Sequence, residues 1–194
     1  MRMTDEQKAA ARTVIVNAAG RRFRVDGLAG VGIDALAREA GQTSGAIYAH
    51  FSSKAAVFAA VVSTGLGRLK AGIERCRPAG PGWARVFALQ YLSGQHRDQI
   101  ADGCLLPSLG ADVARSDKDL RSAFAAELES AIQMLSEGCT GSTAEERREQ
   151  AITLLVLGAG GVLLSRAVPA GLLADEILGA ASRAASRLST TTSG

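Results

Sequence analysis

Cysteine is scarce in this chain of 194 residues, and its three copies lie far apart without a CxxC pair. An odd number of widely spaced cysteines argues against a disulfide framework and against a zinc site. The N-terminus shows no signal-peptide pattern, and free thiols are typical of a reducing compartment. We therefore expect a cytoplasmic protein with no metal and no cofactor.

Aromatic residues make up 4% of the chain, prolines number four, and β-branched residues rarely cluster. Alanine, leucine and arginine are abundant instead, which favours an all-α protein. The most apolar run spans residues 151–165, which is short of the ~20 residues that cross a bilayer. We interpret it as a helix buried in protein and expect no membrane association.

Charge is unevenly distributed, although the net value is only +3. Residues 1–57 hold eight Lys or Arg against five Asp or Glu, so +3, while the remainder holds fourteen of each, so zero. A basic N-terminal segment on a neutral body suits the binding of a polyanion at one end. A chance fluctuation of charge is the alternative interpretation, and charge alone leaves both open.

Apolar residues recur with helical spacing along the chain, and capping residues and glycine or proline breaks separate the segments. Thr4 and Gln7 have the spacing of a capping box, Asp26-Gly27 ends the first segment, Gly41 stands as a left-handed C-cap, and Ser116 as a later N-cap. Helices are expected at about residues 4–26, 33–40, 43–51, 52–75, 83–96, 105–115, 117–137, 142–168 and 171–188.

Two short helical segments joined at Gly41 have the pattern of a helix-turn-helix, whose second helix enters the DNA major groove with its N-terminal end first. The residues at that end, Thr43 to Ala46, are small, so the helix can approach base edges. Tyr48 offers a hydroxyl to a phosphate, and Lys54 stands at a helix start, where backbone N–H groups favour an anion. The alternative is an ordinary helical hairpin, with Tyr48 as a core aromatic and His50 as a surface or capping residue.

The stretch from Gly27 to Val62 resembles the N-terminal domain of the TetR family of transcriptional repressors, through GIDALAREAG, TSGAIYAHF and SSKAAVF. The resemblance implies two parts: a helix-turn-helix DNA-binding domain at residues 1–58 and a helical effector-binding and dimerisation domain at 59–188. The remaining tail at 189–194, STTTSG, is expected to be disordered from its own sequence. The resemblance also implies which residues meet DNA: Thr43, Ser44, Gly45 and Ala46 at bases or backbone, and Tyr48, His50 and Lys54 at phosphates.

Three positions depart from the pattern of that family. Val31-Gly32 stands where Thr or Ser often begins the second helix, so a contact from that N-cap to phosphate is expected to be missing. Ser44 stands where Lys or Arg is frequent, and Gln42 where an apolar residue is usual. Gln42 is therefore a further candidate for DNA contact, and a place on the surface of the turn is the alternative.

The resemblance predicts a homodimeric, ligand-responsive repressor that binds a pseudo-palindromic, double-stranded DNA operator and is released by a small apolar effector. Its dimerisation would use the last two long helices. Eight residues fit a close helix–helix seam there: Leu154, Leu155, Leu157, Val162 and Leu163, with Gly158, Gly160 and Gly161. A plain core helix fits the same pattern.

A weaker resemblance links DGCLLPSLGADVAR to a TetR subgroup with Gly-Cys before a helix, some of whose members sense electrophiles or oxidants. The matching residue is Cys104, and a helix N-terminus makes a thiol more reactive. A reactive Cys104 would make the chain a redox-sensing regulator without a small-molecule ligand, whereas an inert, packed cysteine is the alternative. A small thiol enzyme using Cys104 and His96 is a remote third possibility. Because no catalytic constellation accompanies these two residues, we expect no enzyme activity.

Overall fold

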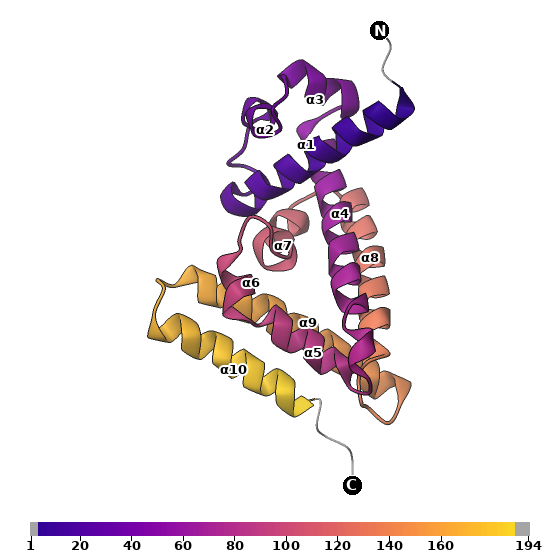
Figure 1. Cartoon of the computed structure of the whole chain (residues 1–194), viewed down its shortest axis with the longest axis vertical. Coiled ribbons are helices and arrows are strands. Elements are labelled where there is room, and N and C mark those ends of the chain that lie inside the picture. The colour runs from indigo at the N-terminus through magenta and orange to yellow at the C-terminus, as the bar shows by residue number, and fades with distance from the viewer. Residues whose placement is uncertain (1–3, 189–194) are drawn as a thin grey trace. The chain divides into compact units, whose positions relative to one another are not determined.

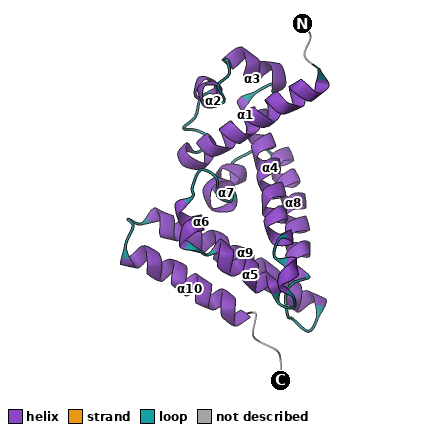
Figure 2. Ribbon diagram, in the orientation of Figure 1, coloured by secondary structure: helices purple, strands orange, loops and turns teal. Residues whose placement is uncertain are grey.

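The computed structural model describes residues 4–188, which form helices joined by loops (Figure 2). This secondary structure confirms the predicted all-α fold class. The chain packs into two compact units, Met1–Gly65 with Ile100–Phe124 and Leu66–Gln99 with Ala125–Gly194. The functional division expected after residue 58 concerns activity rather than packing and stays a prediction. The expected disordered tail at 189–194 lies outside the described residues.

The first unit is built on α1 (Asp5–Asp26), against which α2 (Ile33–Glu39) and α3 (Ser44–His50) both pack (Figure 1). Its core includes the edge-to-face rings of Phe23 and Phe58, whose centroids are 5.5 Å apart. Burial of such apolar side chains holds the short helices α2 and α3, which are too short to be stable alone. Three further elements complete the unit: the beginning of α4 (Lys54–Glu74), α7 (Leu106–Ala114) and the beginning of α8 (Lys118–Ser136).

Helix α1 begins and ends at the residues that local signals in the sequence predict. The Thr4 hydroxyl accepts a hydrogen bond from the Gln7 N–H (3.2 Å), and the Gln7 side chain accepts one from the Thr4 N–H (2.9 Å), which completes the capping box. Gly27 follows the last helical residue with φ 72°. Because a side chain is strained at that φ, a glycine is the residue that ends the helix most readily here.

The second unit combines the ends of α4 and α8 with five further elements: a 3-10 turn (Arg77–Ala79), α5 (Trp83–Tyr91), α6 (Gly94–Asp98), α9 (Ala144–Ala167) and α10 (Leu172–Leu188). The last two helices lie side by side, and α5 packs on both (Figure 1). Thr143 caps α9 in a second capping box with Glu146, so the long helix begins where its sequence predicts.

Glycines on α9 allow neighbouring elements to approach closely inside the second unit. A Cβ on Gly161 would lie 2.8 Å from the Cβ of Ala181 on α10 and 2.9 Å from a methyl of Leu92. A Cβ on Gly158 would lie 3.0 Å from the ring of Tyr91 on α5. These two glycines therefore make close contacts within the chain itself.

The predicted helix–helix seam is wrong for the residues of α9 that this packing buries: Leu154, Leu155, Gly158, Gly161 and Val162. They fit the alternative of a plain core helix, because their partners are α5 and α10 of the same chain. Leu163 differs, since 49% of it is exposed. The same helix thus has a buried face and an exposed apolar face.

Two stretches, Lys54–Ala79 and Ala144–Ala167, are long and apolar enough to cross a membrane by length and composition alone. The second corresponds to α9, which extends well beyond the apolar run at 151–165. Packing of α9 against α5, α6 and α10 gives its apolar residues a place in a protein core, so its hydropathy has an explanation that needs no bilayer.

Two predicted helix boundaries differ from the structure. Residues 83–96 form two helices rather than one, because the Ser93 hydroxyl accepts a backbone N–H (3.2 Å) and starts α6. The start of α8 is capped by Asp117, whose carboxylate accepts the Leu120 N–H (2.8 Å). Ser116, the predicted cap, donates its hydroxyl back to the preceding turn instead.

Candidate nucleic-acid interface

Backbone hydrogen bonds fix the turn between α2 and α3. The Gly41 N–H donates to the Arg38 carbonyl (3.1 Å), and the Gln42 N–H donates to the Ala37 carbonyl (2.9 Å). This pair of bonds is the Schellman arrangement, which requires a left-handed residue after the helix. Gly41 has φ 62°, so the predicted left-handed position is confirmed, and the geometry of the turn follows from a glycine.

A cap and two buried side chains hold α3 in place. The Thr43 hydroxyl oxygen accepts the Ala46 N–H at 3.2 Å. Ile47 is fully buried and Phe51 is 4% exposed. Tyr48, by contrast, is 56% exposed. It is therefore no core aromatic, and its hydroxyl is available to a partner outside the chain.

The residues predicted to contact DNA are all at least partly accessible. Small side chains surround the N-terminal end of α3, so a partner can come close to its backbone. The exposed members are Gln42, Thr43, Gly45 and Tyr48, and the half-buried members are Ser44, Ala46, His50 and Lys54. Seven of these lie between the turn and the last residue of α3, whereas Lys54 belongs to the start of α4.

Lys54 is turned toward the loop between α1 and α2. Its ammonium group donates to the carbonyls of Leu28 and Val31, each at 3.0 Å. An ammonium has three N–H donors, so two are used inside the chain. The structure thus gives Lys54 a structural task that the sequence did not reveal, and its predicted contact with phosphate depends on the remaining donor.

Asp112 is a residue of this region that sequence reasoning missed. Its carboxylate lies on α7, is 12% exposed, accepts the Leu28 N–H at 3.2 Å and pairs with Arg115 at 2.8 Å. Asp112 and Lys54 therefore hold the same loop through its N–H and its carbonyl groups. No local pattern signals this bond, because 84 residues separate the two partners.

Part of the positive charge of the first unit is paired within it. Arg21 bridges to Glu39 (3.3 Å), and Arg22 bridges to Asp26 (2.7 Å). Arg12 is exposed and stacks its guanidinium over an aromatic ring at the end of α3 (4.6 Å to the centroid). The field that a polyanion would meet is therefore weaker than the charge count alone implies.

The start of α2 fits the predicted departure at Val31-Gly32. Gly32 is the N-cap of the helix and has no side chain to bond either the helix or a phosphate. Its carbonyl still accepts the first helical N–H groups, those of Ala35 and Leu36 (3.1 Å each). Any anion contact at this end would come from backbone rather than from a hydroxyl.

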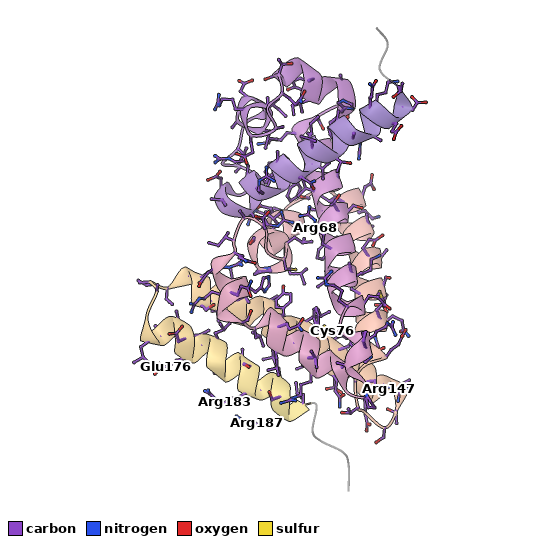
Figure 3. The ribbon with its side chains drawn as sticks, in the orientation of Figure 1. Arg68, Cys76, Arg147, Glu176, Arg183 and Arg187 are labelled. Atoms are coloured by element: carbon purple, nitrogen blue, oxygen red, sulfur yellow. The ribbon has the colours of Figure 1, made fainter. Side chains whose placement is uncertain are left out.

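The three cysteines have different surroundings. Cys76 is buried at the end of α4 (Figure 3), and burial raises the pKa of its thiol. Burial also raises the pKa of Cys139, to about 11. Both are thus poor nucleophiles near neutral pH. Cys104 is half-buried and lies two residues before α7, next to its N-cap Leu105. Over residues 4–188, no group of three His, Cys, Asp or Glu side chains is placed to hold a metal ion.

His96, the histidine of the remote thiol-enzyme alternative, is integrated into the second unit. Its Nδ1 lies 2.7 Å from the Tyr91 carbonyl, and its own carbonyl accepts a bond from Arg166 of α9 at 2.8 Å. Burial lowers the pKa of His96, the bond to Tyr91 opposes that effect, and the nearby Arg166 adds to it. These contacts describe a packed histidine that joins α5, α6 and α9.

Residues 15–61 match the model of a family described as bacterial regulatory proteins, tetR family. A transcriptional regulator of the TetR family from Cytophaga hutchinsonii is 19% identical, with 99% of this chain and 100% of that one covered and a TM-score of 0.72. The reduced form of NemR from E. coli is 22% identical over 95% and 100% of the chains, with a TM-score of 0.73. The regulatory protein TetR from Rhodobacter sphaeroides is 18% identical over 91% and 97%, with a TM-score of 0.73. No curated protein matches the chain.

Proposed function

We propose that the chain is a transcriptional repressor of the tetR family of bacterial regulatory proteins and acts in the cytoplasm. The match of residues 15–61 to the model of that family and the similar fold of solved regulators support this proposal. The chain binds a pseudo-palindromic operator as a homodimer and leaves the operator when a small molecule binds. The observation that carries this proposal is the accessible N-terminal end of α3, where small side chains stand on a helix anchored from below by Ile47 and Phe51.

The proposed contacts divide by chemistry. The small residues Thr43 to Ala46, with Gln42 beside them, approach base edges in the major groove. Tyr48, His50 and Lys54 contact phosphates. These contacts position the DNA-binding domain on the duplex without reading the base sequence. Since phosphate contacts release counterions, affinity for the operator falls as salt concentration rises.

The exposed apolar face of the last two helices supports dimerisation. Its members on α9 are Ile152, Val156, Leu163 and Leu164, and its members on α10 are Leu172 and Leu173. Charged residues of α10 are exposed as well, including Glu176, Arg183 and Arg187, which Figure 3 labels on that helix. Exposed large apolar side chains together with charged ones are typical of a protein–protein interface. Val156→Asp should therefore give monomers in sedimentation experiments, and an unchanged dimer would exclude this face.

The effector proposal rests on the resemblance to the tetR family, in which the helical domain that follows the DNA-binding domain takes a ligand. We propose a small apolar molecule. It releases DNA only to the extent that it binds better to the conformation that cannot span both half-sites.

Selection of bound DNA from a random pool tests the proposed function. The purified chain should enrich a palindromic site whose half-sites are about 34–36 Å apart or a related span. A pool that stays random, or an enriched site without symmetry, would contradict the proposal. Tyr48→Ala, an exposed position, provides a folded variant that should enrich the same site more weakly.

A redox- or electrophile-sensing regulator is the second candidate function. One of the similar structures is described as the reduced form of NemR from E. coli, a name that refers to a redox state, and this favours the second candidate. Cys104 would be the sensor, since burial raises the pKa values of Cys76 and Cys139. Alkylation of the thiol by N-ethylmaleimide should then release DNA from the wild type and from Cys76→Ser, but not from Cys104→Ser. Release that persists in Cys104→Ser would exclude this candidate.

A further inference from the structure

A side-chain hydrogen bond crosses the turn between α2 and α3. The Ser44 hydroxyl, on the first residue of α3, donates to a carboxylate oxygen of Asp34 in the first turn of α2. Asp34 is exposed and Ser44 is half-buried. The bond therefore lies at the surface of the end of α3 that the proposed function turns toward DNA.

The direction of this bond follows from the chemistry of the two groups. A carboxylate has only acceptor atoms, whereas a serine hydroxyl has one proton and two lone pairs. The proton of Ser44 is therefore used by Asp34, and the hydroxyl can offer only lone pairs to any further partner. Ser44 becomes an acceptor toward the outside of the protein.

The neighbouring hydroxyl is not fixed in this way. Thr43 accepts the Ala46 N–H with its oxygen at 3.2 Å, so its proton and its second lone pair both remain for an outside partner. Of the two adjacent hydroxyls, only that of Ser44 is therefore held to one polarity. A group of fixed polarity can discriminate between base edges, because each base pair shows its own order of donors and acceptors in the major groove.

We propose that Ser44 is a specificity-determining residue that accepts a hydrogen bond from an exocyclic amino group, N4 of cytosine or N6 of adenine, and that Asp34 is the positioning residue that gives it this polarity. The proposal rests on the proposed function. Asp34 makes no attraction to DNA itself, since a carboxylate near phosphates is repelled. Its charge weakens binding to every sequence, and the polarity of Ser44 is the compensating gain in selectivity.

The test compares pools of selected DNA for four proteins: wild type, Ser44→Ala, Asp34→Ala and Glu39→Gln. Ser44→Ala and Asp34→Ala should lose preference at the same base pair of each half-site. Glu39→Gln removes a carboxylate from the same helix without touching Ser44, because Glu39 pairs with Arg21 (3.3 Å). It should raise affinity uniformly and leave every base preference unchanged.

Base analogues, tested with the wild type and with the Ser44→Ala and Asp34→Ala variants, then identify the atom that is read. At the base pair found above, adenine is replaced by purine, or cytosine by 2-pyrimidinone, so that one amino group is lost. Binding should weaken about three- to tenfold, the range of one neutral hydrogen bond. The same replacement should cost Ser44→Ala and Asp34→Ala almost nothing. A 7-deaza purine, which lacks the N7 acceptor, should weaken binding equally for the wild type and Ser44→Ala.

Several outcomes overturn the inference. One is a loss on removal of the amino group that is as large for Ser44→Ala as for the wild type. Another is coupling of Ser44 to the N7 acceptor instead, which would make it a donor. A third is a uniform gain in affinity for Asp34→Ala with unchanged base preferences, which would give Asp34 only a charge effect. A wild-type pool without a palindrome overturns the proposed function as well, so the two failures are distinguishable.

Discussion

At the N-terminal end of α3, Thr43 to Ala46 are small residues open to a partner, whereas on α9 the small residues Gly158 and Gly161 already lie against side chains of their own chain. Small size serves a close approach in both places. At α3 the partner that would approach lies outside the chain, whereas at α9 the elements that approach are α5 and α10 of the same chain. Substitutions at the first place should therefore change binding, and substitutions at packed glycines should change stability.

The largest expected effect sharpens the packed side of this comparison. A Cβ on Gly138 would lie 2.3 Å from Cε2 of Trp83, a ring that is 7% exposed and that the Arg77 guanidinium also covers. Gly138→Ala should destabilise the chain by about 1–3 kcal/mol, because a rigid ring cannot give way without moving its neighbours. Thermal unfolding followed by the fluorescence of Trp83, the single tryptophan, measures the change.

Gly67→Ala is the matched control. Gly67 lies on α4, and a Cβ there would meet no heavy atom within 4 Å among the residues that the structure describes. The alanine should stabilise the helix by up to about 1 kcal/mol. A melting temperature of Gly138→Ala equal to that of this control would show that the ring accommodates the methyl group.

Lys54→Met has the next largest expected effect. It tests a residue that could contribute both to stability and to DNA binding. The methionine keeps most of the side-chain stem, but the carbonyls of Leu28 and Val31 lose a charged donor. We expect a loss of about 1–2 kcal/mol in the free energy of unfolding, since unsatisfied, partly buried carbonyls are costly. Chemical denaturation measures this loss.

Salt titration separates the second role of Lys54 from the first. If its remaining donor contacts a phosphate, the slope of log K against log salt for operator binding should fall by about one unit in Lys54→Met. An unchanged slope together with lower stability would leave Lys54 with its structural task alone. Lys54→Arg keeps the charge and should keep the slope.

Tyr48→Ala has a smaller effect on the fold and a selective effect on binding. Because Tyr48 is 56% exposed, its removal should change stability by no more than about 0.5 kcal/mol. Loss of a phosphate contact should weaken operator binding by about tenfold, and Tyr48→Phe should reproduce much of that loss through the missing hydroxyl. Gel-shift titration measures both. Val25→Ala, which removes an equally exposed side chain from α1, should leave affinity unchanged.

The parts of this molecule that the sequence predicts correctly depend on neighbours in the chain. The capping box of Thr4 and Gln7 and the left-handed Gly41 are decided within a few residues, so their patterns carry the information. The accessibility of Tyr48 follows from helical spacing, because Ile47 and Phe51 occupy the inner face. The all-α class follows from the same periodicity.

The remainder depends on contacts between distant segments. Asp112 and Leu28 are bonded across 84 residues, and nothing near either residue indicates the partner. The glycines of α9 indicate close packing but do not show which surface packs against them. A dimer interface with a second copy of the chain and a core within one chain would give the same sequence pattern. Ser93 is different, because an N-cap serine is a local signal. The helical spacing of residues 83–96 predicted a single helix despite that signal.

The smallest expected effect concerns the packed unit and its response to pH. Burial lowers the pKa of His96 in the folded chain, and Arg166 lowers it further against the opposing bond to Tyr91. The unfolded chain, with a histidine pKa of about 6.5, therefore binds the proton more readily than the folded chain. Stability should be highest above that pH and should decline as the pH falls through 6.5 toward the lower folded value.

Melting temperatures between pH 5 and pH 8 test this prediction, with His96→Gln as the comparison. Glutamine can still bond the Tyr91 carbonyl but cannot take up the proton, so its curve should be flatter than that of the wild type over this range. Operator binding by folded wild type should not follow the same curve, because His96 belongs to the packed unit and not to the end of α3. Parallel curves for the two proteins would mean that protonation of His96 is not coupled to folding.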